Sequence, residues 1–593
     1  MLRQLLLLGL ALISATIQAA DAAKALHDFF AAEWDYTMQR SPTWASQLGD
    51  RRWNDRWEDL APEAIEAEHR HNQDALARLR KTDRKALSPR DQLNYDLFEH
   101  RLTQGIEGHA FRWHLVPLNQ RGGLQTEDEL ADSLRFETLK DFEDWLARLR
   151  ALPRYAAQTT ALMREGMRTR IIHAKIVMQR VPAQIEKQIV SDPEKSPFYK
   201  PFANIPKALV ADRDRLQREA RDVIAQQVVP AYRQFHTFFT REYLPACFDQ
   251  VGCWQMPDGD ARYAFEAKKF TTTSLTPREI HELGLKEVAR IRGEMLAIKD
   301  KVGFKGDLPA FFTFLRTDPK FYYKTPQELL VGYHAMSRRI DPLLVKVFKT
   351  LPRMPYGVEA IPDKIAPDTT TAYYRPPAAD GSRAGTYFVN LYRPETRPKW
   401  EMMALSLHEA VPGHHLQIAL AQEQGELPNF RRYGGYTAFI EGWGLYSEYL
   451  GEELGLYADS YDKFGQLTYE MWRAVRLVVD TGMHSLKWDR QRAIDFFKAN
   501  APKQENDITN EIDRYISWPG QALAYKVGEL KLKELRARTA KELGSKFDVR
   551  EFHDEVLRHG AVPLEILERF VGEWVKAKHV ASSQRGEKPP AQR

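Results

Sequence analysis

Residues 405–417, LSLHEAVPGHHLQ, carry two histidine-containing pairs within a short apolar run. The first pair is His408-Glu409 and the second, six residues further on, is His414-His415, with Pro412-Gly413 between them. Proline has no N–H to donate to the carbonyl four residues earlier, and its ring clashes there. A helix through this run must therefore kink or bulge.

The spacing of these histidines is a variant of the metal-binding pattern His-Glu-x-x-His. In that pattern, two histidines one helical turn apart bind zinc and the glutamate polarises the attacking water. In an undisturbed helix, His415 would lie about 10 Å along the axis from His408, which is long for sharing one ion. A bulge of one or two residues would bring His414 or His415 back over His408. Both therefore remain candidates for the second ligand.

Glu441, within the helical pattern 437–453, is the candidate third ligand. It lies in an apolar setting where an unpaired carboxylate is costly to bury, and a cation would offset that cost. Glu448, seven residues later on the same face, is predicted to accept a hydrogen bond from a ligand histidine. Two histidines, a glutamate and an open water position define the His₂Glu class of catalytic Zn²⁺ sites. The alternative is a polar cluster with no metal.

Residues 351–398 differ from the rest of the chain because prolines and glycines cluster there. Two β-leaning runs, 370–374 and 385–391, flank the turn-forming stretch 376–381, which predicts a hairpin. A peptide substrate could add to such a strand through its main chain. The residues predicted to bind substrate here are Tyr374, Gly385 and Tyr387. A surface hairpin without a ligand is the alternative.

The remaining sequence has mainly helical periodicity. Two helix starts carry capping boxes, at Thr276–Glu279 and Thr325–Glu328. We expect a mainly α fold with a small sheet beside the metal-binding helix. A division into an N-terminal helical region, 23–350, and a catalytic region, 351–580, follows from the change in composition. Packing of 23–580 as one unit is left open.

The N-terminus resembles a secretory signal. Arg3 precedes the apolar run Leu5–Ile17, and small residues follow it, so residues 1–22 are predicted to be cleaved. The run is too short to span a bilayer, and no later run is long enough. We therefore expect a secreted or periplasmic protein without a membrane span. The polar stretch 581–593 is predicted to be a disordered tail.

The charge balance gives no reason to expect a nucleic-acid partner. Lys plus Arg exceeds Asp plus Glu by 86 − 81 = 5, and the two signs are interspersed. The two cysteines, Cys247 and Cys253, lie six residues apart in a loop-like stretch. In an oxidising compartment this spacing predicts a local disulfide.

The run 408–417 resembles the signature of a family of secreted bacterial proteins catalogued as a domain of unknown function. The stretches 441–448 and 514–522, together with Tyr373-Tyr374 and Gly385, are also similar to that family, and the resemblance spans about residues 25 to 575. The family is grouped with the gluzincin-type zincin metallopeptidases. The resemblance thus implies a helical zincin-like fold related to the thimet-type oligopeptidases. Their Gly-His step favours His414 over His415, and their spacing favours Glu441.

The remaining chemistry requires a base and an oxyanion donor. Glu409 is the candidate general base for the water and later proton donor to the leaving amine. Two downstream residues, His484 and Tyr525, are the catalytic candidates for the donor, and the resemblance implies that a tyrosine can take this part. The candidates for holding an oxyanion or a substrate carboxylate are Arg473, Arg476, His484 and Tyr525. Arg476 and Asp480, four residues apart, are instead a simple helix pair in the alternative interpretation.

These features lead to three functional hypotheses. The first is a zinc peptidase of the cell envelope, acting as a carboxypeptidase or oligopeptidase. The second is a zinc hydrolase of another amide or ester, and the third is a binding or scaffold protein without turnover. Glu409 argues against the third, because a degenerate site has no use for a water-activating carboxylate. The sequence does not determine the oligomeric state.

Overall fold

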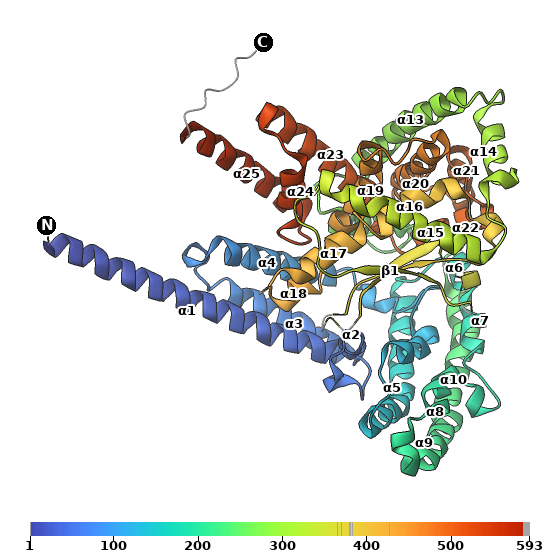
Figure 1. The fold of residues 1–593 in the computed structure, drawn as a ribbon. Helices are drawn as coiled ribbons and strands as arrows, with labels where there is room; N and C mark the ends of the chain where they lie inside the picture. The colour runs from blue at the N-terminus through green and yellow to red at the C-terminus, as the bar shows by residue number, and fades with distance from the viewer. Residues whose placement is uncertain are drawn as a thin grey trace. The chain divides into compact units, whose positions relative to one another are not determined.

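The computed structural model describes residues 2–584 apart from 364–365, 369, 379–380, 382 and 426; the side chains of 2–20, 368 and 581–584 lie outside this description. The chain forms two compact units. The first comprises Met1–Gly259 with Pro428–Phe430, and the second Asp260–Leu427 with Arg431–Arg593. The ribbon in Figure 1 shows the succession of helices along the chain.

The first unit is helical throughout its described elements. Its helices are α1 (Leu2–Arg40), α2 (Pro42–Gln47), α3 (Pro62–Leu79), α4 (Pro89–His109), α5 (Leu139–Thr169), α6 (Lys175–Met178), α7 (Val181–Glu186), α8 (Lys200–Ala203), α9 (Val210–Val223), α10 (Val229–Phe238) and α11 (Leu244–Ala246). Its core is aromatic, and Trp145, Phe198 and Tyr232 are fully buried.

The predicted disulfide is not formed in the first unit. Cys247 and Cys253 are both buried and are not bonded to each other. Cys247 follows the end of α11, and its thiol points back to the carbonyl oxygen of Tyr243 at 3.3 Å. This local hydrogen bond directs the sulfur into the helix end instead of across the loop.

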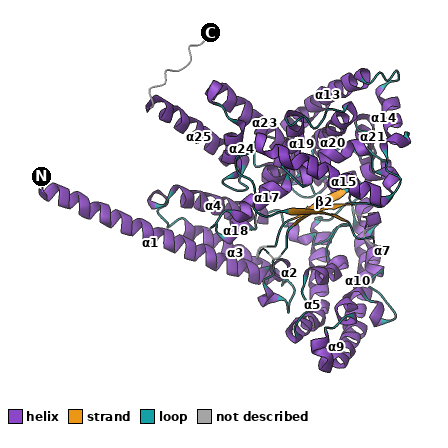
Figure 2. Ribbon diagram, viewed as in Figure 1, coloured by secondary structure: helices purple, strands orange, loops and turns teal. Residues whose placement is uncertain are grey.

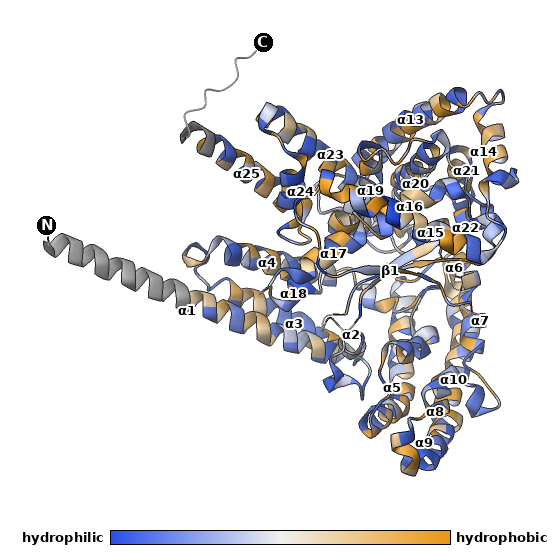
Figure 3. Cartoon of the chain, in the orientation of Figure 1, coloured by the Kyte–Doolittle hydropathy of each residue, from blue (hydrophilic) through white to orange (hydrophobic). Residues whose placement is uncertain are grey.

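The second unit contains the predicted catalytic region. Its helices are α12 (Gly259–Thr271), α13 (Pro277–Lys301), α14 (Leu308–Thr317), α15 (Pro326–Ile340), α16 (Lys399–Glu409), α17 (His414–Glu423), α19 (Thr437–Glu453), α20 (Ser460–His484), α21 (Arg490–Asn500), α22 (Glu505–Ser517), α23 (Ala524–Leu543), α24 (Val549–Leu557) and α25 (Leu564–Gln584). The short α18 (Asn429–Arg432) is divided between the units. Most helices mix apolar and polar residues, as expected for helices that bury one face (Figure 3).

Both predicted capping boxes are present at the starts of α13 and α15. One predicted helix, 510–539, is wrong, because the structure has two helices there, α22 and α23. Pro519 cannot donate a backbone hydrogen bond, and Gly520 has φ +79°, a left-handed conformation that ends the helical run.

The boundary between the units falls at Gly259, well before residue 350. Residues 260–350 pack with the second unit because α13 lies directly against α20. A Cβ atom at Gly284 of α13 would lie 2.7 Å from Leu477 Cβ and 2.8 Å from a methyl group of Val478. The change in composition near residue 350 therefore marks the start of the sheet region and not a boundary between the compact units.

The sheet has three short strands, β1 (Tyr356–Ala360), β2 (Ala372–Arg375) and β3 (Gly385–Val389), in the order β1-β3-β2 (Figure 2). Strands β2 and β3 form the predicted hairpin, with Tyr374 paired to Tyr387. The sequence did not predict β1, which pairs in parallel with β3. The central strand β3 is fully buried, and β2 forms one edge.

The two predicted terminal segments are only partly described. Residues 2–20 form the start of α1, and their side chains are outside the description, so the signal peptide remains a prediction. The predicted tail, 581–593, lies outside the described residues except for the backbone end of α25. None of the described helices is both long enough and apolar enough to cross a membrane.

Candidate metal centre

The run 405–417 forms a helix break and not the expected bulge. Helix α16 ends at Glu409 and α17 begins at His414, with the turn 410–413 between them. The Val411–Pro412 peptide is cis. A Cβ atom at Gly413 would lie only 1.9 Å from the carbonyl oxygen of His408, so only glycine fits this close approach. The turn brings the two imidazole rings, His408 and His414, to 4.7 Å between centroids.

Three predicted ligands converge at this turn. The Nε2 atoms of His408 and His414 each lie 3.5 Å from Oε2 of Glu441 in α19. All three ligand atoms lie within 4.8 Å of one another, and among the described residues this is the one such group able to hold a metal ion. Ligands at tetrahedral zinc, with bonds of about 2.1 Å, are separated by about 3.4 Å. The donor set and its spacing therefore fit zinc.

The protonation of the centre reflects its burial and its charges. Burial opposes a charge on His408, but hydrogen bonds to Glu441 and Glu448 outweigh it and raise its pKa to about 9. Burial alone would raise the pKa of Glu441, yet the charge of His414 and hydrogen bonds from both histidines hold it well below its usual range. The carboxylates of Glu441 and Glu448 and the two imidazoles thus stabilise one another's charged forms.

Helix α19 holds the turn in place through contacts on one face. The indole Nε1 of Trp443 donates to the carbonyl oxygen of Pro412 at 2.8 Å. A Cβ atom at Gly444 would lie 2.8 Å from the imidazole of His408, so this glycine lets the helix approach the ring. Glu448 accepts from Nδ1 of His408 at 2.8 Å, as the sequence predicted, and it is fully buried. That bond leaves Nε2 of His408 to face Glu441.

His415 does not point at the other ligands. Its Nδ1 accepts from the hydroxyl of Tyr374 at 2.8 Å, and its Nε2 donates to the carbonyl of Met354 at 2.9 Å. A Cβ atom at Gly385 would lie 2.7 Å from Nδ1 of His415, so glycine is needed there. The two adjacent histidines therefore have different places: His414 lies with the candidate ligands, and His415 ties α17 to the sheet.

Glu409 is the last residue of α16 and is half-buried. Among the described residues, none forms a hydrogen bond or ion pair with its carboxylate. Its charge nevertheless contributes to the raised pKa of both His408 and Tyr387, which places it beside the centre. It is thus a carboxylate next to the candidate ligands with no structural partner.

Two predicted substrate-binding arginines have protein partners. Arg473 stacks over Tyr469, with its NH2 3.8 Å from Oε1 of Glu448. The guanidinium is therefore close enough to act as a counter-charge to the buried carboxylate of Glu448, which is hydrogen-bonded to His408. Arg476 donates to the hydroxyl of Tyr515 at 2.8 Å and forms an ion pair with Glu511 of α22 at 3.1 Å.

Tyr525 lies against Arg476, whose guanidinium carbon is 4.3 Å from the centre of its ring. The phenol is half-buried near the start of α23, and α23 packs on α19 through glycines at 442 and 528. His484, by contrast, is buried, with Nε2 3.0 Å from the carbonyl oxygen of Tyr515. Burial lowers the pKa of His484 to about 4, and the structure does not bring it into the ligand group.

The strand residues predicted to bind substrate also have structural contacts. Tyr387 in β3 is fully buried, with its hydroxyl 3.4 Å from Oγ of Ser406. Gly385 lies in the same central strand, so neither residue borders the open edge of the sheet. Tyr374 lies in β2, the edge strand, and is half-buried.

Trp443 and Gly444 are site residues that were not predicted from the sequence. Each of them helps to fix the geometry of the turn, but neither carries ligand chemistry. The available signal was glycine within a helical pattern, because a glycine inside a helix costs about 1 kcal/mol relative to alanine and indicates close packing. Two such glycines, at 442 and 444, flank Trp443 directly after the predicted ligand Glu441.

The chain belongs to the family described as "Bacterial protein of unknown function (DUF885)", whose model matches residues 42–571. No curated protein matches it. It is similar to a solved structure described as a "putative lipoprotein" from Colwellia psychrerythraea, with 28% identity, a TM-score of 0.85, and coverage of 94% of this chain and 99% of that one. A "putative lipoprotein of unknown function" from Shewanella oneidensis, at 18% identity and a TM-score of 0.66 over 92% and 99% of the chains, shares the fold.

Proposed function

We propose that the protein is a zinc-dependent peptide hydrolase of the cell envelope. The observation that carries this proposal is the convergence of His408, His414 and Glu441, whose ligand atoms all lie within 4.8 Å of one another. Glu409, directly after His408, adjoins them, and its carboxylate has no partner among the residues that the structure describes. A metal-binding scaffold alone would not need that second feature.

The donor set is the one found in zincin metallopeptidases, to which the sequence is similar. His408 and His414 supply imidazole nitrogens, and Glu441 supplies a carboxylate oxygen, which together make the His₂Glu set of catalytic zinc sites. The break between α16 and α17 replaces the single helix turn of the usual motif. A zincin-like fold is therefore part of this proposal.

The roles of the chain's own residues follow from their positions. Zinc, when bound, supplies Lewis acidity, which makes water a stronger acid and polarises a carbonyl group. Glu409 takes a proton from water and later returns it to the leaving amine. Glu448 keeps His408 in the tautomer that presents Nε2. Tyr525 is the proposed hydrogen-bond donor to the developing oxyanion.

A peptide substrate is supported by the sheet. Strand β2 lies at its edge and pairs only with β3 among the described strands. Such an edge can pair with an extended peptide through main-chain hydrogen bonds. The envelope location is supported by the signal-like residues 1–22 and by the two relatives described as lipoproteins.

The test compares Glu409→Gln with a matched control on zinc content and peptide cleavage. The control is Glu452→Gln, which removes an exposed carboxylate of α19, the helix that carries Glu441. We expect about one zinc per chain in the wild type and both variants, since none loses a ligand. Cleavage of a peptide library should fall about 10²–10⁴-fold in Glu409→Gln only. Unchanged turnover in that variant would exclude Glu409 as the base.

The same screen distinguishes the alternatives. A zinc-loaded protein that cuts no peptide but hydrolyses another amide or ester would support the second hypothesis. A protein that binds zinc and hydrolyses neither class would be a scaffold.

A further inference from the structure

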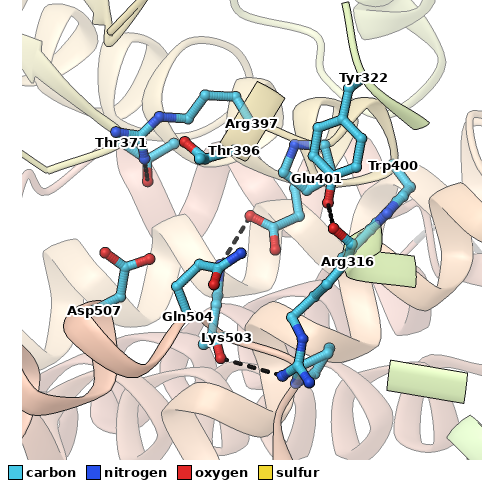
Figure 4. Close-up of a pocket in the computed structure, with 12 residues that line it drawn as sticks. Arg316, Tyr322, Thr371, Thr396, Arg397, Trp400, Glu401, Lys503, Gln504 and Asp507 are labelled. Carbon is cyan, nitrogen blue, oxygen red and sulfur yellow. Dashed lines mark hydrogen bonds and ion pairs between the residues drawn. The ribbon is translucent and has the colours of Figure 1, made fainter. Parts of the chain in front are cut away.

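A hollow lies at the N-terminal end of α16, the end opposite Glu409 (Figure 4). Its lining comes from the loop before α16, from Thr371 immediately before β2, and from residues 502–507 at the start of α22. Neither the candidate ligands nor Glu409 line it. It is therefore distinct from the metal centre, although it shares α16 with that centre.

Two helices begin at this hollow, and neither start is capped by a side chain. The N-cap of α16 is Pro398 and that of α22 is Gln504, and neither makes a side-chain capping bond. Uncapped helix starts present backbone N–H groups and the positive end of the helix dipole, which favour anions. Trp400, a residue only 2% exposed, also lines the hollow, and its buried indole Nε1 has no hydrogen-bond partner among the described residues.

Some of the charged side chains around the hollow form an ion pair, and others do not. Lys503 and Glu401 form a buried ion pair at 2.8 Å. Arg397 donates to the hydroxyl of Thr371 at 3.2 Å, its Nε has no partner, and it forms no ion pair among the described residues.

Two more charged groups line the hollow. Among the described residues, the guanidinium of Arg316 has one hydrogen-bond partner, the carbonyl oxygen of Lys503 at 3.5 Å. Asp507 also lacks an ion-pair partner among the described residues, and burial raises the pKa of its carboxyl. Among the described residues, the lining therefore has two cations, Arg316 and Arg397, and one acid, Asp507, that form no ion pair.

Helix α16 runs from the hollow to the candidate metal centre, and β2 runs from the hollow to His415, the residue next to the candidate ligand His414. Along α16, the eight steps from Glu401 to Glu409 span about 12 Å. Along β2, Thr371 at the hollow and Tyr374 at His415 are about 10 Å apart. An extended peptide alongside β2 would cover either distance with three or four residues.

We propose that this hollow binds a carboxylate of the peptide substrate, three or four residues from the bond that is cut. The carboxylate would contact Arg397 and the two helix starts. Its source is either the C-terminus of the peptide or an acidic side chain. The inference rests on the proposed function for its substrate and names the class: peptides with a carboxylate at this spacing.

The test measures the binding of three peptides to zinc-loaded full-length Glu409→Gln protein by titration calorimetry. The peptides share one sequence and end in a free carboxylate, in an amide, or in a glutamate amide. We expect the free acid or the glutamate peptide to bind about tenfold more tightly than the plain amide. Whichever of the two does so identifies the source of the carboxylate.

Two neighbouring substitutions should then act in opposite directions. Arg397→Met should remove the tenfold preference, and Asp507→Asn should increase it by removing a like charge. Arg393→Met, an exposed cation of the same loop that pairs with Glu395, is the control and should change nothing. The inference would be overturned if all three peptides bound the Glu409→Gln protein with equal affinity. It would also be overturned if Arg397→Met weakened the binding of the acid and of the amide by the same factor.

A cleavage assay of the same peptides with protein that retains Glu409 distinguishes a failure of this inference from a failure of the proposed function. If the peptides are cut but the acid and amide bind equally, the hydrolase stands and the carboxylate site fails. If nothing is cut but the preference and its response to Arg397→Met persist, the binding site stands and the peptidase assignment fails.

Discussion

Two buried charged clusters in the second unit are built in opposite ways. Around Lys526, three carboxylates converge on an ammonium group that the chain itself supplies: Glu529 at 2.5 Å, Glu470 at 2.7 Å and Glu287 at 3.1 Å. At the candidate metal centre, two imidazoles and the carboxylate of Glu441 converge, and none of the described lysines or arginines pairs with Glu441.

The difference separates a cluster that contains its own counter-charge from one that we propose binds an external ion. Buried charge is costly unless it is paired. The Lys526 cluster satisfies that condition with its own residues, so it can serve stability alone. The candidate metal centre has its donors at a separation that suits zinc, and none of the described residues pairs with the adjoining Glu409. These two features support the proposal that a cation binds there.

The largest expected effect is on the self-contained cluster. Lys526→Met should lower the free energy of unfolding by about 3–5 kcal/mol, because it leaves buried carboxylates without their central counter-charge. Denaturant unfolding with and without a chelator measures this. Lys531→Met, which removes a partly exposed lysine of the same helix, should cost about 1 kcal/mol or less. Equal losses in the two variants would contradict the comparison.

The next effect concerns the metal centre. Zinc at a thousand times its dissociation constant should stabilise the wild type by about 4 kcal/mol over the chelated protein. His414→Ala should abolish this zinc-dependent gain, because it removes a ligand. His415→Ala should retain the gain, because that histidine contacts Tyr374 and Met354 instead. Thermal unfolding with zinc or chelator distinguishes them, and the reverse outcome would exchange the roles of the two histidines.

A smaller effect is expected at Glu448, which contacts the candidate ligand His408 but is not itself a candidate ligand. Glu448→Gln should weaken zinc binding about 10–100-fold, since the carboxylate no longer fixes the tautomer of His408. Competition with a chromogenic chelator measures the affinity. Glu452→Gln is the control on the same helix. An unchanged zinc affinity in Glu448→Gln would show that His408 needs no such partner.

The smallest effect on zinc affinity should come from substituting Arg473, which contacts Glu448 and none of the candidate ligands. Arg473→Met removes the cation 3.8 Å from Glu448 and should weaken zinc binding by less than about tenfold. Arg473→Lys should restore part of the affinity because it keeps the charge. A larger loss in activity than in zinc affinity would instead indicate that Arg473 contacts the substrate.

Local signals predicted most of the helical fold. The capping boxes before α13 and α15 and the turn residues between β2 and β3 specify structure within a few residues, and the structure confirms all three elements. Strand β1 was missed because its pairing with β3 joins segments well separated in sequence. A five-residue strand after a proline-rich loop has too little alternation to be recognised alone.

The candidate ligands were predictable because their chemistry is restricted to a few residue types. Their exact arrangement was not, since it depends on contacts between helices. The close approach of Gly444 to the ring of His408 and the hydrogen bond of His415 to Tyr374 are both long-range features. For the same reason the sequence suggested a bulge where the chain breaks into two helices.

Helices α19 and α23 touch through their main chains. A Cβ atom on Gly442 would lie 2.5 Å from the Cα of Gly528, and one on Gly528 would lie 1.9 Å from the carbonyl oxygen of Ala438. Neither position can gain a methyl group without parting the two backbones. Glu441 lies on α19 and Tyr525 on α23. The close contact between the two backbones therefore fixes the distance between the helix segments that carry the carboxylate and the phenol.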